Sequence, residues 1–174
     1  MSNSCWSELL AQKLATLSAA LKHKPRLALL GIGNELNGDD AAGVLAVRAL
    51  RTRLAPRPQL LLIEASLAPE AFTAPLRRFE PDCVILIDAA LLDEAPGTIE
   101  LVDWQQTDGL SATTHTLPPS VLVKFIQHEF NCPVELILIQ PHDIDFDHPV
   151  TPVVSNAIES VVAGFTSLFS SIYQ

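Results

Sequence analysis

A glycine-rich segment that ends in two adjacent carboxylates is the first feature that suggests chemistry. Residues 31–43, GIGNELNGDDAAG, follow an apolar run and place Asp39 next to Asp40. The segment is a weak dinucleotide fingerprint, because the third glycine of that motif would stand where Leu36 does. A phosphate loop would need Lys and Ser or Thr after Gly38, and the two acids found there repel phosphate. We expect Asp39 to cap a helix, and Asp40 either to do the same or to hold a cation.

Asp88 and His115 are the other side chains whose positions favour a site. Asp88 follows the apolar run in CVILIDAA, where a buried acid without a partner costs roughly several kcal/mol. His115 lies in SATTHTLPP, a loop ahead of a predicted helix. At ~3.3 Å per residue, the loop of residues 104–117 is long enough to bring His115 to Asp40 and Asp88.

Two carboxylates and one imidazole suit a divalent transition metal, zinc or nickel more than magnesium. The same three groups could instead orient a water molecule and transfer protons without any metal.

A second cluster of acids and histidines occurs in QPHDIDFDHP. Such a segment between a strand and a helix is more typical of a solvated loop than of a metal site, so we rank it second. Its members are His142, Asp143, Asp145, Asp147 and His148.

These side chains require a sheet whose strands end at a common edge. RLALLGIG, QLLLIEAS, CVILIDAA and PVELILIQP read as buried strands, and CVILIDAA is apolar on both faces, as in the middle of a parallel sheet. Helical patterns separate them, including APEAFTAPLRRFE, which we expect to break at Pro75. The alternation predicts a three-layer α/β/α fold with a twisted, mostly parallel, five-stranded sheet.

The fourth strand, TIELVDW, is predicted to run antiparallel at an edge of the sheet. The short connection that precedes it contains the turn-forming segment APGT and leaves no room for a helical crossover.

Composition limits the remaining function classes. The 174 residues fit a single α/β domain, residues 1–174. A formal net charge of −9 without a basic run argues against a nucleic-acid partner. We expect no membrane segment, and three separated cysteines indicate reduced thiols in the cytoplasm.

An additional N-terminal helix is expected within residues 1–24, running from about residue 4 to residue 22. Its leucines recur at steps of three and four, which indicates that it packs on the domain. The stripe consists of Trp6, Leu9, Leu10, Leu14, Leu17 and Leu21.

The chain resembles the hydrogenase maturation endopeptidases, which trim the C-terminal extension of the large subunit of nickel-iron hydrogenases, and most of all their formate-linked branch. The motifs that carry the resemblance are GIGNELNGDDAAG, VILIDAALLDEAPGTIELV, TTHTLP and IQPHDIDFDHPVTP, within residues 26–165. The resemblance implies the same α/β fold. It also implies that Asp40, Asp88 and His115 contact the nickel of the substrate and are the catalytic residues.

That resemblance further implies a large-subunit precursor as partner and nickel carried by the substrate, with zinc or cadmium able to occupy the same site. We expect a monomer, and a substrate-facing edge that includes Gly33, Asn34, Asp39 and Glu64. The family's usual Asp-Gly-Gly is replaced by Glu64, Ala65 and Ser66, so Glu64 either takes the family acid's place or ends a strand. The alternative function is a non-catalytic module of the same fold that captures a peptide or a metal ion.

Overall fold

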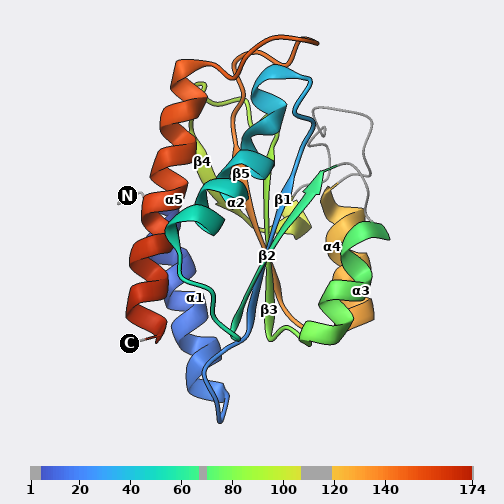
Figure 1. Ribbon diagram of the computed structural model, residues 1–174, viewed down its shortest axis with the longest axis vertical. Helices are drawn as coiled ribbons and strands as arrows, with labels where there is room; N and C mark the ends of the chain where they lie inside the picture. The colour runs from blue at the N-terminus through green and yellow to red at the C-terminus, as the bar shows by residue number, and fades with distance from the viewer. Residues whose placement is uncertain (1–4, 67–69, 107–118, 174) are drawn as a thin grey trace.

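The core of the molecule is one five-stranded sheet. The computed structural model describes residues 5–66, 70–106 and 119–173. The strand order is β2-β1-β3-β5-β4, and all neighbouring pairs are parallel except β4 with β5. The predicted fold and the antiparallel edge strand are therefore confirmed (Figure 1). The strands are β1 (Leu27–Ile32), β2 (Leu60–Ser66), β3 (Cys83–Ala89), β4 (Ile99–Val102) and β5 (Val134–Ile139).

The three inner strands are buried along their whole length, whereas the edge strands are not. Every residue of β1, β3 and β5 is buried, which explains their near-continuous apolar sequences. β2 was predicted as a buried strand, but most of its residues are only half-buried. It lies at an edge of the sheet with β1 as its one strand neighbour, so it is less covered than the inner strands.

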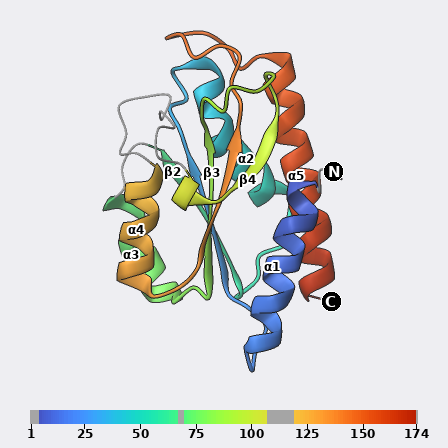
Figure 2. The same ribbon diagram turned by 180° about the vertical axis from the view of Figure 1, so that it is seen from behind.

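Helices cover both faces of the sheet. α1 (Trp6–Ala20), α2 (Ala42–Arg53) and α5 (Pro152–Tyr173) lie on one face, and α3 (Glu70–Phe79) and α4 (Pro119–Phe130) on the other (Figures 1 and 2). Each face has its own apolar cluster, because successive residues of the inner strands point to opposite faces.

α1 docks as its leucine pattern predicts. Trp6, Leu10 and Leu14 are buried, and Trp6 packs against Phe165 of α5 with 5.6 Å between ring centroids. Leu9 departs from the pattern and is 38% exposed. The helix begins at Trp6 and ends at Ala20, two residues before the predicted end at Lys22.

α3 continues through Pro75, contrary to the predicted break. A proline removes one backbone donor and disfavours an α conformation for the residue before it. Pro75 is the sixth of the ten residues of α3, and the helix still runs on to Phe79. Phe72 and Leu76, on either side of Pro75, are buried in the apolar cluster of this face, and that packing holds the helix together despite the lost donor.

α5 is the one described helix long and apolar enough to cross a membrane by length and composition. Residues along one side of it, among them Val154, Val161 and Phe165, are buried in the apolar cluster with α2 and the sheet. This is the packing of a core helix in a globular domain.

Candidate active site

The acids of the site meet at the edge where β1, β2, β3 and β5 end, here called the carboxyl edge. Open α/β sheets bind their ligands outside this edge. Asp39 and Asp40 lie in η1 (Gly38–Ala41), the short 3-10 helix that follows β1, and Asp88 is the penultimate residue of β3. All three are buried.

Close backbone approach brings Asp40 and Asp88 together. A Cβ placed on Gly43 would lie 2.1 Å from the carbonyl oxygen of Ile87, the residue before Asp88. A Cβ placed on Gly33 would lie 1.8 Å from the carbonyl oxygen of Asp40, and Gly33 also has a φ of 136°. Only glycine fits at either position, so the glycines of the motif set the distance between the end of β1, η1 and the end of β3.

Asp88 is an unusual acid. It is 7% exposed, and its carboxylate accepts a hydrogen bond from the N–H of Ala89 at 2.8 Å. Burial, and after it the negative charge of Asp40, raise the pKa of Asp88 from an ordinary 3.8 to about 8. No cationic side chain of the described residues forms a salt bridge with it.

Asp40 is held by the turn before it. It is 1% exposed, and its Oδ2 accepts a hydrogen bond from the N–H of Asn34 at 3.0 Å. The Asn34 side chain in turn bonds the N–H of Leu36 and the side chain of Asn37. Gly33 and Asn34 were predicted at the substrate-facing edge, and both lie in this turn, in contact with Asp40.

Asp39 has a different role from the predicted one. Neither η1 nor α2 has a side-chain N-cap hydrogen bond. The Asp39 carboxylate accepts four hydrogen bonds instead, from the N–H groups of His142, Asp143 and Thr151 and from the Thr151 hydroxyl, at 2.7–3.0 Å. The helix-cap interpretation was wrong, because the loop that follows β5 supplies more donors than the start of a helix does.

Glu64 lies within β2 and is held by two arginines of α2. Its carboxylate forms salt bridges with Arg48 at 2.7 Å and Arg51 at 2.6 Å. Arg48 also binds the carboxylate of Glu35 through both its terminal nitrogens, at 2.6 and 2.7 Å. Glu64 thus ties the sheet edge to α2 and, through Arg48, to the turn before Asp40.

The predicted residue His115 falls outside the described residues. Of the three predicted ligands, the structure therefore describes Asp40 and Asp88. Two carboxylates that repel each other in a buried setting fit a divalent cation, because the cation's charge would offset both.

The second-ranked cluster also comes together. Ligand atoms of Asp143, Asp145 and His148 lie within 4.8 Å of one another. His148 Nδ1 lies 2.7 Å from Asp143 Oδ2, and this pairing raises the pKa of His148. Two hydrogen bonds lower the pKa of Asp143. The larger effect comes from the N–H of Asp145 and the smaller from the His148 side chain. These contacts are those of a solvated loop that is held together by its own acids and histidine.

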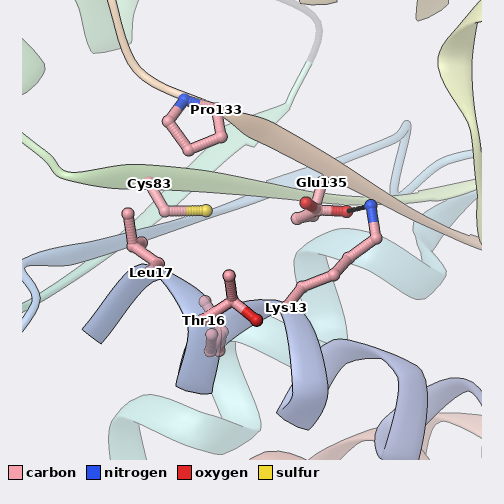
Figure 3. A pocket seen from close by; sticks show the side chains of 7 residues that line it. Lys13, Thr16, Leu17, Cys83, Pro133 and Glu135 are labelled. Atoms are coloured by element: carbon pink, nitrogen blue, oxygen red, sulfur yellow. Dashed lines mark hydrogen bonds and ion pairs between the residues drawn. The ribbon is translucent and has the colours of Figure 1, made fainter. Parts of the chain in front are cut away.

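One partly buried ion pair was not predicted. At the opposite end of the sheet, here called the amino edge, Glu135 of β5 binds Lys13 of α1 at 2.7 Å (Figure 3). Together with Cys83 they line a cavity of about 320 Å³ between α1 and the sheet. The partners lie 122 positions apart, so no local pattern could have indicated the pair.

The sequence is similar to those of known hydrogenase maturation proteases. The family model described as hydrogenase maturation protease matches residues 44–167, more than half of the chain, beginning after the glycine-rich segment. A Methanocaldococcus jannaschii protein assigned as a hydrogenase maturation protease is 36% identical over 132 residues, covering 72% of this chain and 78% of the relative. The hydrogenase 3 maturation protease of Escherichia coli K12 is 30% identical over 134 residues, covering 76% of this chain and 84% of the relative.

Solved structures agree. The crystal structure of the [NiFe] hydrogenase maturation protease HycI from Thermococcus kodakarensis superimposes with a TM-score of 0.76 at 26% identity, covering 89% of this chain and 99% of that one. The Escherichia coli endopeptidase HycI, solved in solution, gives a TM-score of 0.69 at 28% identity, covering 79% of this chain and 86% of that one. These similarities are consistent with the predicted formate-linked branch.

Proposed function

Because the chain belongs to the hydrogenase maturation protease family, we propose that it removes the C-terminal extension of a nickel-loaded large-subunit precursor, using Asp40, Asp88 and His115. The chain is accordingly a peptidase, a hydrolase. The comparisons favour this function over a non-catalytic binding module, because the named relatives are proteases. The substrate's nickel and the role of each residue are the proposed part.

The observation that carries the proposal is the meeting of Asp40 and Asp88 at the carboxyl edge. The negative charge of Asp40 contributes to raising the pKa of Asp88 to about 8, so near neutral pH the Asp88 carboxyl group largely keeps its proton. Nickel that binds the Asp88 carboxylate displaces this proton, and the metal's charge then favours both ionised acids. The site is thus better suited to an arriving cation than to remaining without one.

In the proposed reaction, the nickel of the precursor binds Asp40, Asp88 and His115 and so positions the scissile peptide bond. A water molecule attacks the peptide carbonyl, its proton passes to a carboxylate, and the amine of the extension leaves protonated. The metal either polarises the carbonyl as a Lewis acid or acts only as the recognition element. In both cases a precursor without nickel is not aligned for cleavage.

Mass spectrometry of the precursor tests this function. Asp40→Asn, Asp88→Asn and His115→Ala should each slow processing of the nickel-loaded precursor about 100-fold or more. Glu8→Gln, an exposed acid in the first turn of α1, is the control and should process at the normal rate. Normal processing by all three site variants would refute the assignment, and stable complex formation without cleavage by the unaltered protein would favour the binding module.

We further propose that the protein works as a monomer in the cytoplasm. The free thiols of Cys5, Cys83 and Cys132 support a reducing compartment. Sedimentation of the purified protein at micromolar concentration tests whether it is a monomer, and a dimer mass would contradict this proposal.

A further inference from the structure

Two apolar side chains at the carboxyl edge are more exposed than any other large apolar side chain of the described residues. Phe146 is 72% exposed and Leu36 is 58% exposed. A single exposed apolar side chain is ordinary, but apolar side chains grouped beside a reactive site mark an interaction surface.

Leu36 and Phe146 come from different loops that are joined by their backbones. The N–H of Asp147 donates to the carbonyl oxygen of Leu36 at 2.7 Å, and the N–H of Asp39 donates to that of Asp143 at 2.8 Å. The buried Asp39 carboxylate fixes the second loop through its four hydrogen bonds. The two side chains are thus carried on one well-bonded platform, which lowers the entropy cost of binding.

The platform adjoins the proposed catalytic acids. Leu36 lies in the turn whose Asn34 N–H bonds the carboxylate of Asp40. Leu91, shortly after Asp88, and Val153, at the start of α5, are also exposed apolar residues near this edge. A polypeptide presenting a scissile bond to Asp40 and Asp88 must pass over the loops of this edge.

We propose that Leu36 and Phe146 form an apolar docking surface, here called the docking pair, for the body of the hydrogenase large-subunit precursor. The inference rests on the proposed function, because it requires that precursor to approach Asp40 and Asp88. It adds how the enzyme holds the protein around the nickel, beyond the metal contact itself.

Charge favours the precursor over a second copy of this chain as the occupant. Asp145 and Asp147 flank Phe146 and are exposed, and the chain carries a formal net charge of −9. Two copies meeting at this surface would bring like charges together, whereas a partner with an apolar patch and basic side chains around it would match.

The test compares the double variant Leu36→Ser/Phe146→Ser with a matched control, Leu9→Ser/Phe125→Ser, whose side chains are 38% and 43% exposed on α1 and α4. With the nickel-loaded precursor as substrate, the docking variant should raise KM about tenfold or more and leave kcat within about twofold. The control should leave both constants unchanged. Leu36→Ala and Phe146→Ala, made singly, should each raise KM by a smaller factor and serve if the double variant folds poorly.

A binding measurement keeps failure of this inference distinct from failure of the proposed function. Asp88→Asn keeps the other proposed contacts to the precursor and should cleave it about 100-fold more slowly. This variant is titrated with the precursor by calorimetry, with and without the two serine substitutions. A Kd raised about tenfold by the serines supports the docking pair, and an unchanged Kd and KM overturn it. Normal cleavage by Asp88→Asn would count against the proposed function alone, whatever the serines do.

Self-association gives the other contrary outcome. If the unaltered protein sediments as a dimer, and the docking variant as a monomer with an unchanged KM, then the pair joins two copies of this chain and the inference is wrong.

Discussion

The two ends of the sheet each bury a carboxyl group, and they treat it differently. Glu135, at the amino edge, is 9% exposed and forms a salt bridge with Lys13 at 2.7 Å (Figure 3). Asp88, at the carboxyl edge, is 7% exposed and forms no salt bridge with any described residue, and the negative charge of Asp40 adds to the effect of burial in raising its pKa. Two acids of similar burial therefore differ in their surroundings. A lysine offsets the charge of Glu135, whereas burial and a second acid make ionisation of Asp88 unfavourable.

The difference indicates that the carboxyl edge, and not the amino edge, contains an acid whose ionisation lowers the stability of the fold. A buried carboxyl group without a cation either keeps its proton, as Asp88 largely does near neutral pH, or costs stability when it ionises. Asp39 sharpens the contrast, because it lies at the same edge as Asp88 and is also buried, but four donors compensate it. Acids of similar burial thus differ in their partners: Asp39 has four donors and Glu135 has a lysine, and Asp88 is the acid that we propose binds the nickel of the substrate.

The largest effect on stability is expected from removing the compensated acid of the carboxyl edge. Asp39→Ala leaves three backbone N–H groups and the Thr151 hydroxyl without their acceptor, and should lower the free energy of unfolding by about 3 kcal/mol or more. Asp39→Asn retains one acceptor oxygen and should lose less. Denaturant unfolding measures both, and a loss under about 1 kcal/mol for the alanine variant would contradict the role given to Asp39.

The next effect has the opposite sign. The folded pKa of Asp88, about 8, lies above its unfolded value, so the folded state binds more protons between pH 4 and 8. The metal-free protein therefore loses stability from this group as the pH rises through that window. Asp88→Asn should remove the loss, raising the free energy of unfolding by roughly 2 kcal/mol or more at pH 8 and by little near pH 4.

Denaturant unfolding of both proteins across this pH range, with a chelator present, checks the prediction. Glu135→Gln is the matched control from the amino edge, and it should destabilise the protein or leave it unchanged. If Asp88→Asn were less stable than the unaltered protein at pH 8, then Asp88, like Glu135, would stabilise the fold, and this prediction would be wrong.

A smaller loss is expected from the ion pair of the amino edge. Lys13→Met leaves Glu135 buried without its cation, but the lysine side chain is 53% exposed, so solvent screens the pair and the loss should be about 1 kcal/mol. Glu135→Leu in the same chain should recover the loss, because an apolar side chain needs no cation. A double-mutant cycle measures the coupling, and additive losses would mean that the pair contributes nothing.

The smallest effect concerns the solvated loop after β5. The Asp143 carboxylate raises the pKa of His148 above its usual 6.5, so any stability from this pair is present at low pH and is lost as the pH rises through the raised pKa. NMR titration of the imidazole should give a midpoint above 6.5 that falls in Asp143→Asn, with the melting temperature unchanged. A marked drop in melting temperature would mean that the Asp143–His148 pair stabilises the fold, as the hydrogen bonds of Asp39 do, and would contradict this prediction.

Much of the fold could be predicted because the relevant signals are local. The continuous apolar runs around Leu29 and Ile85 indicated inner parallel strands, and the short connection before Ile99 indicated an antiparallel edge strand. The break predicted at Pro75 was wrong, because the burial of Phe72 and Leu76 keeps the helix continuous through the proline. β2 was expected to be buried, since its sequence does not reveal that it lies at an edge.

The site could be predicted only in part. Acids at the ends of β1 and β3 must share an edge in a parallel sheet, so the meeting of Asp40 and Asp88 followed from topology. The partners of Asp39 did not, because His142 and Thr151 lie more than 100 positions away. Nor did those of Glu64, since Arg48 and Arg51 read as ordinary charges on an exposed helix face.

By itself, the sequence determined the order of strands and helices, the glycine positions that permit close approach, and the acids at the carboxyl edge. These depend on residue types and spacing along the chain. Only the tertiary structure decided which acids are compensated, because a buried carboxylate takes its pKa and its role from donors and charges that remote segments bring to it. Asp39 and Asp40 are neighbours in sequence, and folding alone gives Asp39 four hydrogen-bond donors and places Asp40 where its charge raises the pKa of Asp88.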